Sequence, residues 1–455
     1  MLTPDSHELH VLVEDGTTGR LTHQRVELDQ GYDRLAFASD GVHGLAWVGS
    51  ADDQRDLISV VSKVAVLNIA ALVAGDEGAV QERDLNLEEA PQKVAFSRAM
   101  PLFGGDDALR LAAVVTSTRV ALLDLERPRL RARTIFLDPN VHPAEVRFTD
   151  GVAPQAGSEF LLFTSQNSAN SDRGISTYRI LPEDDVAAAE AEGEPRIRLT
   201  YDLLLPDDPP SHFELFPDPS GRKILVVSVG NRAGRATVFE LQSSSIGKTV
   251  TFPDGARASQ VMRAANPGAE LAVLFEDTET GSGEPRLVYM DIDAASQGRP
   301  EAELGEAFAT DVRSVTPVQQ RPGRLLVQLH DSPQLELVDL TGDKPRSTSI
   351  RLRSRAVPVW DRRGGSFYVV SAIGDLLGRV SLDEVGGLTS ATLALDATPS
   401  AVHLLEGAGL IVVDHGLPQG ALTVVPADSL DRESARVLDG IFLEGLIDIA
   451  AGRDQ

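Results

Sequence analysis

Cysteine is absent from the 455-residue chain, which excludes disulfide bonds, thiolate catalysis and cysteine-ligated zinc or iron–sulfur sites. Lysine is rare, with five residues against 37 arginines, a bias typical of proteins from GC-rich bacterial genomes. A chain without cysteine avoids wrong disulfides after export, although a cytoplasmic protein can also lack the residue. We therefore expect a bacterial protein of the periplasm or the cell exterior, with a cytoplasmic location left open.

Long apolar runs are also missing. The longest candidate, Val60–Ala74, is interrupted by Ser62, Lys63 and Asn68, and it falls short of the roughly 18 apolar residues that span a membrane. The residues after Met1 contain neither the basic nor the apolar segment of a signal peptide. The sequence predicts a soluble chain without a transmembrane segment. Association with an outer membrane would require a signal or lipid anchor that had been removed.

Basic residues are too few to balance the acidic ones. The chain has 68 Asp and Glu residues against 42 Lys and Arg residues, a formal net charge of −26. A surface this negative repels the phosphates of nucleic acids and of anionic lipids. The composition, 42% hydrophobic and 24% charged, is that of a folded globular protein. We expect an acidic, solubilising surface whose partners are unidentified proteins, and neither nucleic acid nor a membrane surface.

What the sequence does contain is an internal repeat. Each copy opens with a short strand and a turn, followed by a nearly continuous apolar strand. After a polar gap comes an alternating strand that often ends in an acidic residue, and a more variable fourth strand follows. The mean spacing is about 52 residues, near the range of β-propeller repeats. Opening strands are predicted near Asp33, Gln92, Ala144, His212, Ala258, Asp311, Ala356 and Ser400.

The clearest copy runs from Phe213 to Phe252. Its residues Pro217–Gly221 supply turn chemistry between two apolar runs, as a hairpin requires. The alternating strand returns at 118–125, 286–292, 334–340 and 378–385, with the period of two that indicates a half-buried strand. The continuous apolar strands before these segments are typical of strands covered on both faces. Middle strands of a blade between two neighbouring blades are covered in this way.

These repeats predict an all-β chain that forms a single β-propeller domain over residues 1–455. Eight four-stranded blades are predicted, with seven as the alternative, because Ser62–Leu72 is compatible with either a strand or a buried helix. The hairpin at residues 8–28 is predicted to close the ring by pairing with C-terminal strands, since an open sheet edge invites aggregation. Insertions are expected at 166–174 and at 184–194, the second as a short exposed helix or a disordered segment.

Residues 216–231, with the sequence FPDPSGRKILVVSVGN, resemble the strand–turn–strand unit of bacterial propellers of the YVTN and lactonase-like group and of TolB-like repeats. Pro217, Asp218 and Gly221 carry the resemblance together with the apolar strand that follows, and Phe37–Gly41 is a weaker copy. The resemblance is one of repeat type. The YVTN tetrapeptide, the Trp-Asp ending of WD repeats and the paired glycines of kelch repeats are missing, and two tryptophans are too few for a quinoprotein propeller. The resemblance implies a β-propeller fold and carries over no activity.

The loops that join second to third strands of a propeller emerge on the same face as the connections between blades, and binding sites usually lie on that face. The predicted segments of this loop face carry carboxylates, histidines and arginines. The candidate residues for binding a ligand or partner are Asp52, Asp53, Asp56, His142, Arg173, Asp207, Asp208, His212, Arg232 and His415.

Oxygen-rich loops with histidine can bind Ca²⁺ or another divalent cation. The best ligand group is Asp52, Asp53, Asp56, Asp207, Asp208 and His212. The regular spacing of a calcium-binding loop is missing, so turn formation and solvated charge explain these carboxylates equally well. Ca²⁺ therefore stays an open alternative, and no cofactor is predicted.

No catalytic set can be identified. The sequence lacks the G-x-S-x-G elbow of serine hydrolases. Lactonase-like hydrolysis would need Glu, Arg and His to converge, and the available groups are His142, His212, His415, Arg173 and Arg232. We therefore expect a binding or scaffold protein that acts through its loop face or a blade edge. The alternative is a hydrolase, lactonase-like or metal-assisted, with its site at the mouth of the central channel.

Overall fold

The protein is described here from a computed structural model, and the chain divides into two compact units, Met1–Thr251 and Phe252–Gln455. The structure describes residues 2–3, 7–14, 21–38, 41–49, 63–87, 89–102, 107–149, 159–169, 173–204, 210–217, 224–230, 235–243, 245–251, 256–266, 269–277, 286–290, 302–304, 312–318, 324–329, 334–339, 346–351, 359–361, 366–371, 375–382, 388–405, 409–441 and 448–451.

The first unit contains a three-stranded sheet, four sheets of four strands, a two-stranded ribbon and two short helices. The three-stranded sheet is formed by β1 (Leu2–Thr3), β2 (Glu8–Glu14) and β3 (Leu21–Glu27). The four-stranded sheets are β4 (Arg34–Phe37), β5 (His43–Trp47), β6 (Lys63–Asn68) and β7 (Val80–Asp84); β8 (Lys93–Phe96), β11 (Leu111–Val115), β12 (Arg119–Asp124) and β13 (Arg133–Phe136); β14 (Val141–Phe148), β15 (Glu159–Asn167), β16 (Arg173–Pro182) and β17 (Ile197–Leu204); and β18 (Pro210–Pro217), β19 (Ile224–Gly230), β20 (Arg235–Glu240) and β21 (Ser245–Thr251). The ribbon is β9 (Met100–Pro101) with β10 (Ala108–Leu109), and the helices are α1 (Ile69–Ala74) and α2 (Val186–Glu192).

The second unit contains three four-stranded sheets and one five-stranded sheet. The four-stranded sheets are β22 (Ala256–Asn266), β23 (Ala269–Asp277), β24 (Arg286–Met290) and β25 (Ala302–Leu304); β26 (Val312–Pro317), β27 (Arg324–Leu329), β28 (Gln334–Asp339) and β29 (Arg346–Arg351); and β30 (Val359–Asp361), β31 (Ser366–Ser371), β32 (Leu376–Leu382) and β33 (Leu388–Ala394). The five-stranded sheet is formed by β34 (Ala401–Leu405), β35 (Leu410–Asp414), β36 (Ala421–Pro426), β37 (Arg436–Asp439) and β38 (Asp448–Ala451).

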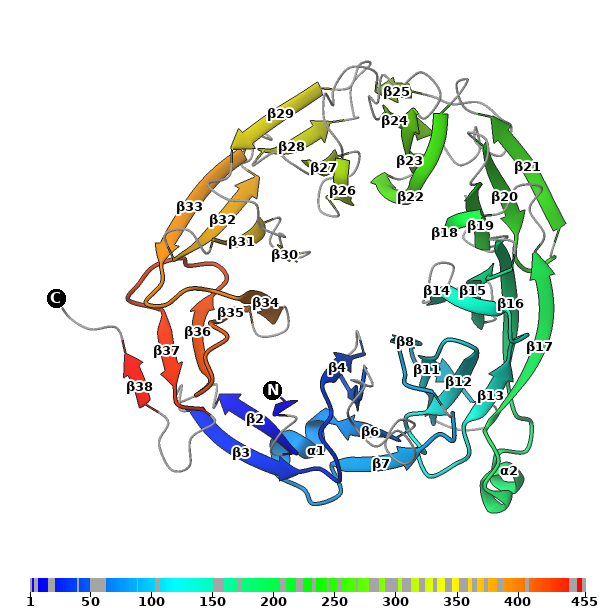
Figure 1. The fold of residues 1–455 in the computed structure, drawn as a ribbon, viewed down its shortest axis with the longest axis horizontal. Coiled ribbons are helices and arrows are strands. Elements are labelled where there is room, and N and C mark those ends of the chain that lie inside the picture. The colour runs from blue at the N-terminus through cyan, green and yellow to red at the C-terminus, as the bar shows by residue number, and fades with distance from the viewer. Residues whose placement is uncertain are drawn as a thin grey trace. The chain divides into compact units, whose positions relative to one another are not determined.

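Each four-stranded sheet is an antiparallel meander with its strands in chain order, interrupted in one sheet by the β9–β10 ribbon between β8 and β11, and this is the blade of a β-propeller. In the first unit, the first strands β8 and β14 of successive blades contact one another, and β18 contacts β15 and β16. Figure 1 shows the fourth strands β13 and β17 at the opposite side of their sheets from β8 and β14. The chain is therefore an all-β β-propeller.

The middle strands of a blade are buried on both faces because two neighbouring sheets cover them. Leu111 and Val115 of β11 pack with Leu161 of the next sheet, whereas Val114 points the other way and packs with Val64 of the preceding sheet. Every residue of β11 is buried, as the continuous apolar run predicts. Burying one such side chain fully stabilises the fold by about 1.5–3 kcal/mol relative to leaving it exposed.

The prediction of eight four-stranded blades is wrong. The described residues form seven four-stranded blades, and the repeat predicted to open near Ser400 forms a five-stranded sheet instead. Its fifth strand, β38, pairs antiparallel with β37, with Val437 opposite Ala450. The predicted closure by pairing of N- and C-terminal strands concerns strands of the two separate units and stays a prediction; within the first unit, β2 pairs with β1 and β3.

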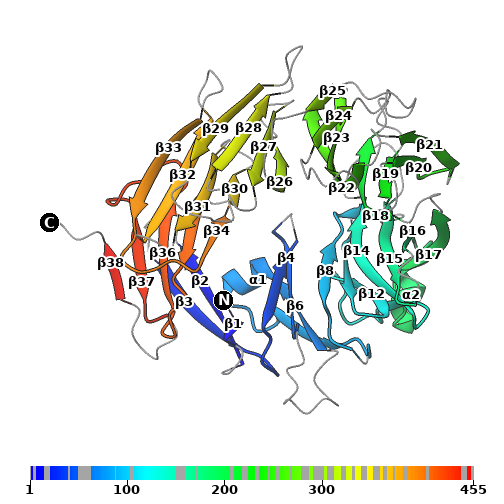
Figure 2. The same ribbon diagram turned by 45° about the horizontal axis from the view of Figure 1, so that its top comes forward.

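The N-terminal hairpin docks on the first four-stranded sheet by one of its faces. Leu9 of β2 is buried in one apolar cluster with Ala65 and Leu67 of β6 and Leu72 of α1. Figures 1 and 2 both show α1 beside β2, and the two elements contact one another. Apolar residues at every second position of β2 thus form one apolar face. The packing of this face holds the hairpin on the first four-stranded sheet.

The ambiguous segment Ser62–Leu72 contains both alternatives in succession. Lys63–Asn68 forms strand β6, and Ile69–Ala74 forms α1, with the Asn68 side chain accepting a hydrogen bond from the Ala71 amide as N-cap. The segment 184–194 forms helix α2, which is the helical one of the two predicted alternatives. Neither helix within the described ranges has the length or the apolarity that a membrane span requires.

Two histidines meet on the N-terminal hairpin. The His10 Nδ1 atom lies 2.9 Å from the His23 Nε2 atom, and the rings are nearly parallel, at 9°. His10 is 2% exposed, and its Nε2 lies 3.3 Å from a Glu8 carboxylate oxygen. Burial is the main cause that lowers the pKa of His10, and the positive charges of a protonated His23 and of Arg25 lower it further. Burial and the charge of Arg25 likewise lower the pKa of His23.

We predict that this pair makes the fold sensitive to acid. Because both imidazoles have a pKa below the ordinary 6.5 when folded, the unfolded chain binds more protons, so stability is complete above pH 6.5 and falls as the pH drops through it. The thermal midpoint and the hydrogen-exchange protection of β2 and β3 should decrease between pH 7.5 and pH 5.5, within about one pH unit of that value. The change His10→Gln with His23→Gln should flatten this dependence, whereas His403→Gln, at an exposed histidine, should not. An unchanged pH profile in the double variant would contradict the prediction.

Candidate functional site

Most residues of the predicted loop-face site lie outside the described residues. These are Asp52, Asp53, Asp56, Asp207, Asp208 and Arg232. His212 lies on β18, where its backbone is opposite Val229 after a β-bulge. Binding of Ca²⁺ by the six predicted ligand residues therefore stays a prediction. Within the described ranges, no group of three or more His, Asp or Glu side chains is arranged to hold a metal ion.

The structure does bring two of the predicted residues to one end of one blade. His142 on β14 is opposite Gln166 on β15, and Gln166 is opposite Arg173 on β16. His142 and Arg173 therefore share one row of the third four-stranded sheet, with a single strand between them. The His142 Nδ1 atom forms a 2.8 Å hydrogen bond with the carbonyl oxygen of Ser117, in the turn between β11 and β12 of the preceding blade. His142 thus links two adjacent blades at the loop face.

A carboxylate that the sequence analysis did not single out holds the same turn. Ser117 donates its hydroxyl to Glu89 at 2.8 Å, and Thr118 donates both its amide, at 3.1 Å, and its hydroxyl, at 2.9 Å. Burial raises the pKa of the Glu89 carboxyl, but the hydrogen bonds from this turn outweigh that effect and hold the pKa below its ordinary value. Glu89 is therefore an ionised clamp on the turn rather than a proton donor.

His415 lies in the second unit and is 6% exposed. Its Nε2 atom is 2.8 Å from the Thr423 hydroxyl, its Nδ1 atom is 3.3 Å from the carbonyl oxygen of Thr398, and its amide donates to Ala421. Both ring nitrogens thus contact the hairpin and the connection that surround them. This environment is that of a histidine that holds a turn.

The acidic residue that ends many third strands has a structural role wherever its contacts are described. At the end of β12, one carboxylate oxygen of Asp124 accepts hydrogen bonds from the amides of Glu126, at 3.0 Å, and Arg127, at 3.1 Å. At the end of β28, Asp339 forms a 2.9 Å ion pair with Arg324, which lies directly opposite on β27. In these two blades the acid at the end of the third strand therefore fixes a turn or the neighbouring strand.

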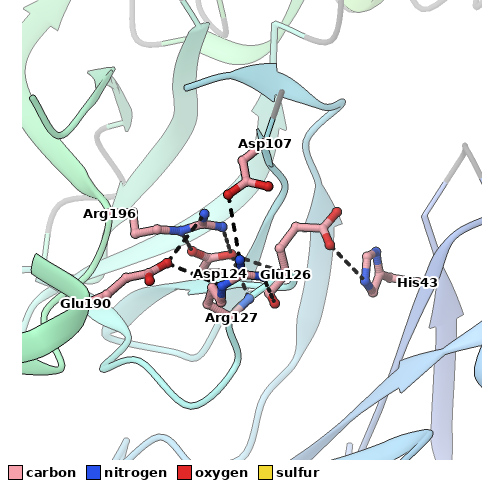
Figure 3. Close-up of polar contacts among 7 residues, drawn as sticks. All are labelled: His43, Asp107, Asp124, Glu126, Arg127, Glu190 and Arg196. Carbon is pink, nitrogen blue, oxygen red and sulfur yellow. Dashed lines mark hydrogen bonds and ion pairs between the residues drawn. The ribbon is translucent and has the colours of Figure 1, made fainter. Parts of the chain in front are cut away.

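Asp124 is also the centre of a buried ion network. Arg196, whose side chain is completely buried, donates to the two Asp124 oxygens at 2.6 and 3.0 Å. Burial lowers the pKa of Arg196, but the Asp124 carboxylate outweighs this and raises it. Figure 3 shows Glu190 of α2 between Arg196 and Arg127, at 3.8 and 3.2 Å from their guanidinium nitrogens.

The network extends over three successive sheets of the first unit. Arg127 reaches Asp107 at 3.7 Å, and the adjacent Glu126 lies 4.0 Å from His43 of the first four-stranded sheet (Figure 3). Glu126 is also paired with Arg110. Each acid within it faces a base, and Arg196 has no solvent access. Such a network is suited to fixing neighbouring blades rather than to proton transfer or nucleophilic attack. The sequence marked Asp124 by its place in the repeat, but no sequence signal connected it with Arg196.

No family model matches the chain, and no curated protein matches it. Among solved structures, the Dos1 propeller is 11% identical, with a TM-score of 0.50 over 83% of this chain and 88% of that one. AztD of Citrobacter koseri is 14% identical over 99% and 98% of the two chains, with a TM-score of 0.43, and streptogramin B lyase is 12% identical over 71% and 89%, with a TM-score of 0.38. The likeness to the Dos1 propeller is one of fold, in agreement with the predicted β-propeller, and it identifies no activity.

We predict that breaking the buried Asp124–Arg196 pair strongly destabilises the fold. Arg196→Met leaves a carboxylate buried without its cation, which typically costs about 3–5 kcal/mol. Arg131→Met is the matched control, because Arg131 also pairs with an acid beside α2, Glu194, but its side chain is 76% exposed. This change should cost less than about 1 kcal/mol. Urea unfolding of the two variants measures the difference, and equal losses would contradict the assignment.

Proposed function

We propose that the protein is a binding module that holds a protein partner on the loop face of its second and third four-stranded sheets. The surface concerned, called the loop platform, consists of residues 117–118, 137–140 and 167–169. The proposal rests mainly on one observation, which is that the middle segment is hydrogen-bonded to each of the other two.

The bonds between the segments come largely from the backbone. The Leu137 amide donates to Thr118 at 3.1 Å, and the Ser168 amide donates to Asn140 at 2.8 Å. His142 and Glu89 fasten the turn at 117–118 from the sides. Loops held in one conformation lose little conformational entropy when a partner binds, so a preorganised platform favours affinity.

The chemistry of the platform favours a polar, positively charged contact. Asp138, Asn140 and Ser168 are exposed, and the Asn167 side chain accepts the Ala169 amide. The chain as a whole carries a formal charge of −26, which attracts a basic protein over a distance and repels an acidic one. We propose an exported bacterial protein as the setting, since a chain without cysteine suits an oxidising compartment.

The test is capture of a partner from native extract by the immobilised full chain. Two variants, each of which replaces an alanine by arginine, form a matched pair. Ala169→Arg adds a bulky cation to the platform, and Ala187→Arg adds the same group to α2, at another position of the same blade; both alanines are exposed. We expect Ala169→Arg to reduce capture at least about tenfold, the effect of losing about 1.4 kcal/mol of binding energy, and Ala187→Arg to leave it unchanged.

Equal capture by both variants would contradict the platform as the binding surface. A hydrolytic activity of the purified protein on lactone or ester substrates, lost in His142→Ala, would contradict a purely binding role and favour the hydrolase alternative. Circular dichroism of the His142→Ala variant checks that it is folded, so that a loss of activity reports on the His142 side chain.

A further inference from the structure

Strand β17 is a long sheet edge. It has eight residues, whereas the fourth strands β7 and β13 of the two preceding sheets have five and four, and β21 and β33 have seven. Among the described strands β17 pairs only with β16, so one side of its backbone has no strand beside it (Figure 1). An unpaired edge of this length offers a row of backbone donors and acceptors to a further strand.

The side chains of β17 leave apolar surface exposed. Tyr201 is 54% exposed and Leu203 is 40% exposed. They lie on the same face as Ile197 and Leu199, which pack on the core between the second and third sheets. The Tyr201 ring packs against Tyr178 of β16 with the two ring planes tilted by 51° and 5.0 Å between the centroids. The apolar row is thus continuous with the core but ends in two large uncovered side chains.

The sequence of β17 is complementary to itself when reversed. If a second copy of Ile197–Leu203 lies antiparallel beside the first, with Thr200 on the two-fold axis, Arg198 is opposite Asp202 twice, once on each side of the axis. Leu199 is then opposite Tyr201, and Ile197 is opposite Leu203. Opposite charges and apolar pairs directly across from one another are the pairings that stabilise antiparallel strands.

We propose that two copies of this chain associate through β17, which forms a continuous antiparallel sheet across a two-fold axis. The axis passes through Thr200, and the exposed Tyr201 and Leu203 of each copy are covered by Leu199 and Ile197 of the other. The interface is isologous, since the same strand serves both partners and the contact closes as a dimer. The inference is independent of the loop platform and of the partner proposed to bind there.

The charges of the strand favour a second copy over other occupants. Chains with a formal charge of −26 repel one another, so a contact between two copies needs a locally balanced surface. Residues 197–204 provide it, with one arginine and one aspartate. In the single chain the Arg198 side chain is 51% exposed and pairs with Asp184 at 3.0 Å and with Glu183 at 3.5 Å. These contacts hold the side chain at the surface near the edge.

Another outermost strand gives a useful contrast. Strand β29 has the sequence RSTSIR, and antiparallel pairing with its own copy would place Arg346 opposite Arg351 at both ends. Like charges directly opposite one another destabilise a strand pair. Self-complementarity is therefore a property of β17 in particular and not of every edge strand in this fold.

The absence of cysteine permits a direct test by cross-linking. In the proposed dimer the two copies of residue 200 are directly opposite one another, with Cβ atoms about 4.5–5.5 Å apart, so Thr200→Cys should form an intermolecular disulfide under mild oxidation. Asp202→Cys is the matched control on the same exposed strand. Its two copies would lie about 14 Å apart, which is too far for a disulfide. We expect the first variant to cross-link at least about tenfold faster than the second.

A charge exchange tests the same register without cysteine. Light scattering of the unmodified chain should give twice its 48.7 kDa. Arg198→Asp should yield the monomer, because aspartates then face one another, and Arg198→Asp combined with Asp202→Arg should restore the dimer. The reversal Arg133→Asp, at an exposed position of β13, should leave the dimer unchanged.

A monomeric unmodified chain at micromolar concentration, or equal cross-linking at positions 200 and 202, would overturn the proposal. So would a dimer that persists in Arg198→Asp, since another surface would then hold it. Loss of the dimer in Arg133→Asp would equally place the contact elsewhere. Circular dichroism of each variant confirms that the fold is retained, so that loss of the dimer reports on the interface.

Discussion

The structure depends on the burial of its middle strands between neighbouring sheets. No sheet of four short strands encloses a core by itself, because its two faces point toward its two neighbours. Strand β11 makes this clear, since Leu111 and Val115 belong to one apolar cluster and Val114 to another. A blade therefore exists only as part of a series, and its stability is the sum of its own strand pairing and the contacts on both sides.

Polar contacts at the margins of the sheets complement this apolar packing. Arg147 of β14 donates to Glu214 of β18 at 2.7 Å, and Arg98 pairs with the buried Glu159 at 3.3 Å. Each contact joins one sheet of the first unit to the next, where the apolar layer ends. The outermost strands lie beyond these contacts, and there the chain either places charged residues, as on β7, or leaves an edge open to another strand, as on β17.

Local features of this fold were predictable from sequence, whereas contacts between repeats were not. The continuous apolar run at 108–117 predicted a strand buried on both faces, and β11 is that strand. The acid at Asp124 was recognisable because the alternating third strand repeats it. Its partner Arg196 is 72 residues away in the sequence, and the relation between the two depends on how one blade is placed against the next. A periodic pattern contains no information about that placement.

The packing of the N-terminal hairpin was likewise not predictable. Its sequence was compatible with pairing at an edge, and the structure shows that Leu9 and its neighbours bury an apolar face against β6 and α1. Pairing at an edge and packing by a face are both compatible with an alternating strand, and only the tertiary contacts decide between them. For the same reason Glu89, in an irregular connection, could not be assigned to the turn at 117–118 that it clamps.

Residue-resolved native-state hydrogen exchange tests the central claim most directly, namely that the middle strands of each blade are stabilised from both sides. The account predicts that the amides of β11, β12, β15 and β16 exchange most slowly, at a rate set by global unfolding of the first unit, whereas those of the outer strands β7 and β13 exchange faster by local opening. Exchange from β7 and β13 that is as slow as from β11 and β12 would contradict it, because the order of protection would then not follow burial between neighbouring sheets.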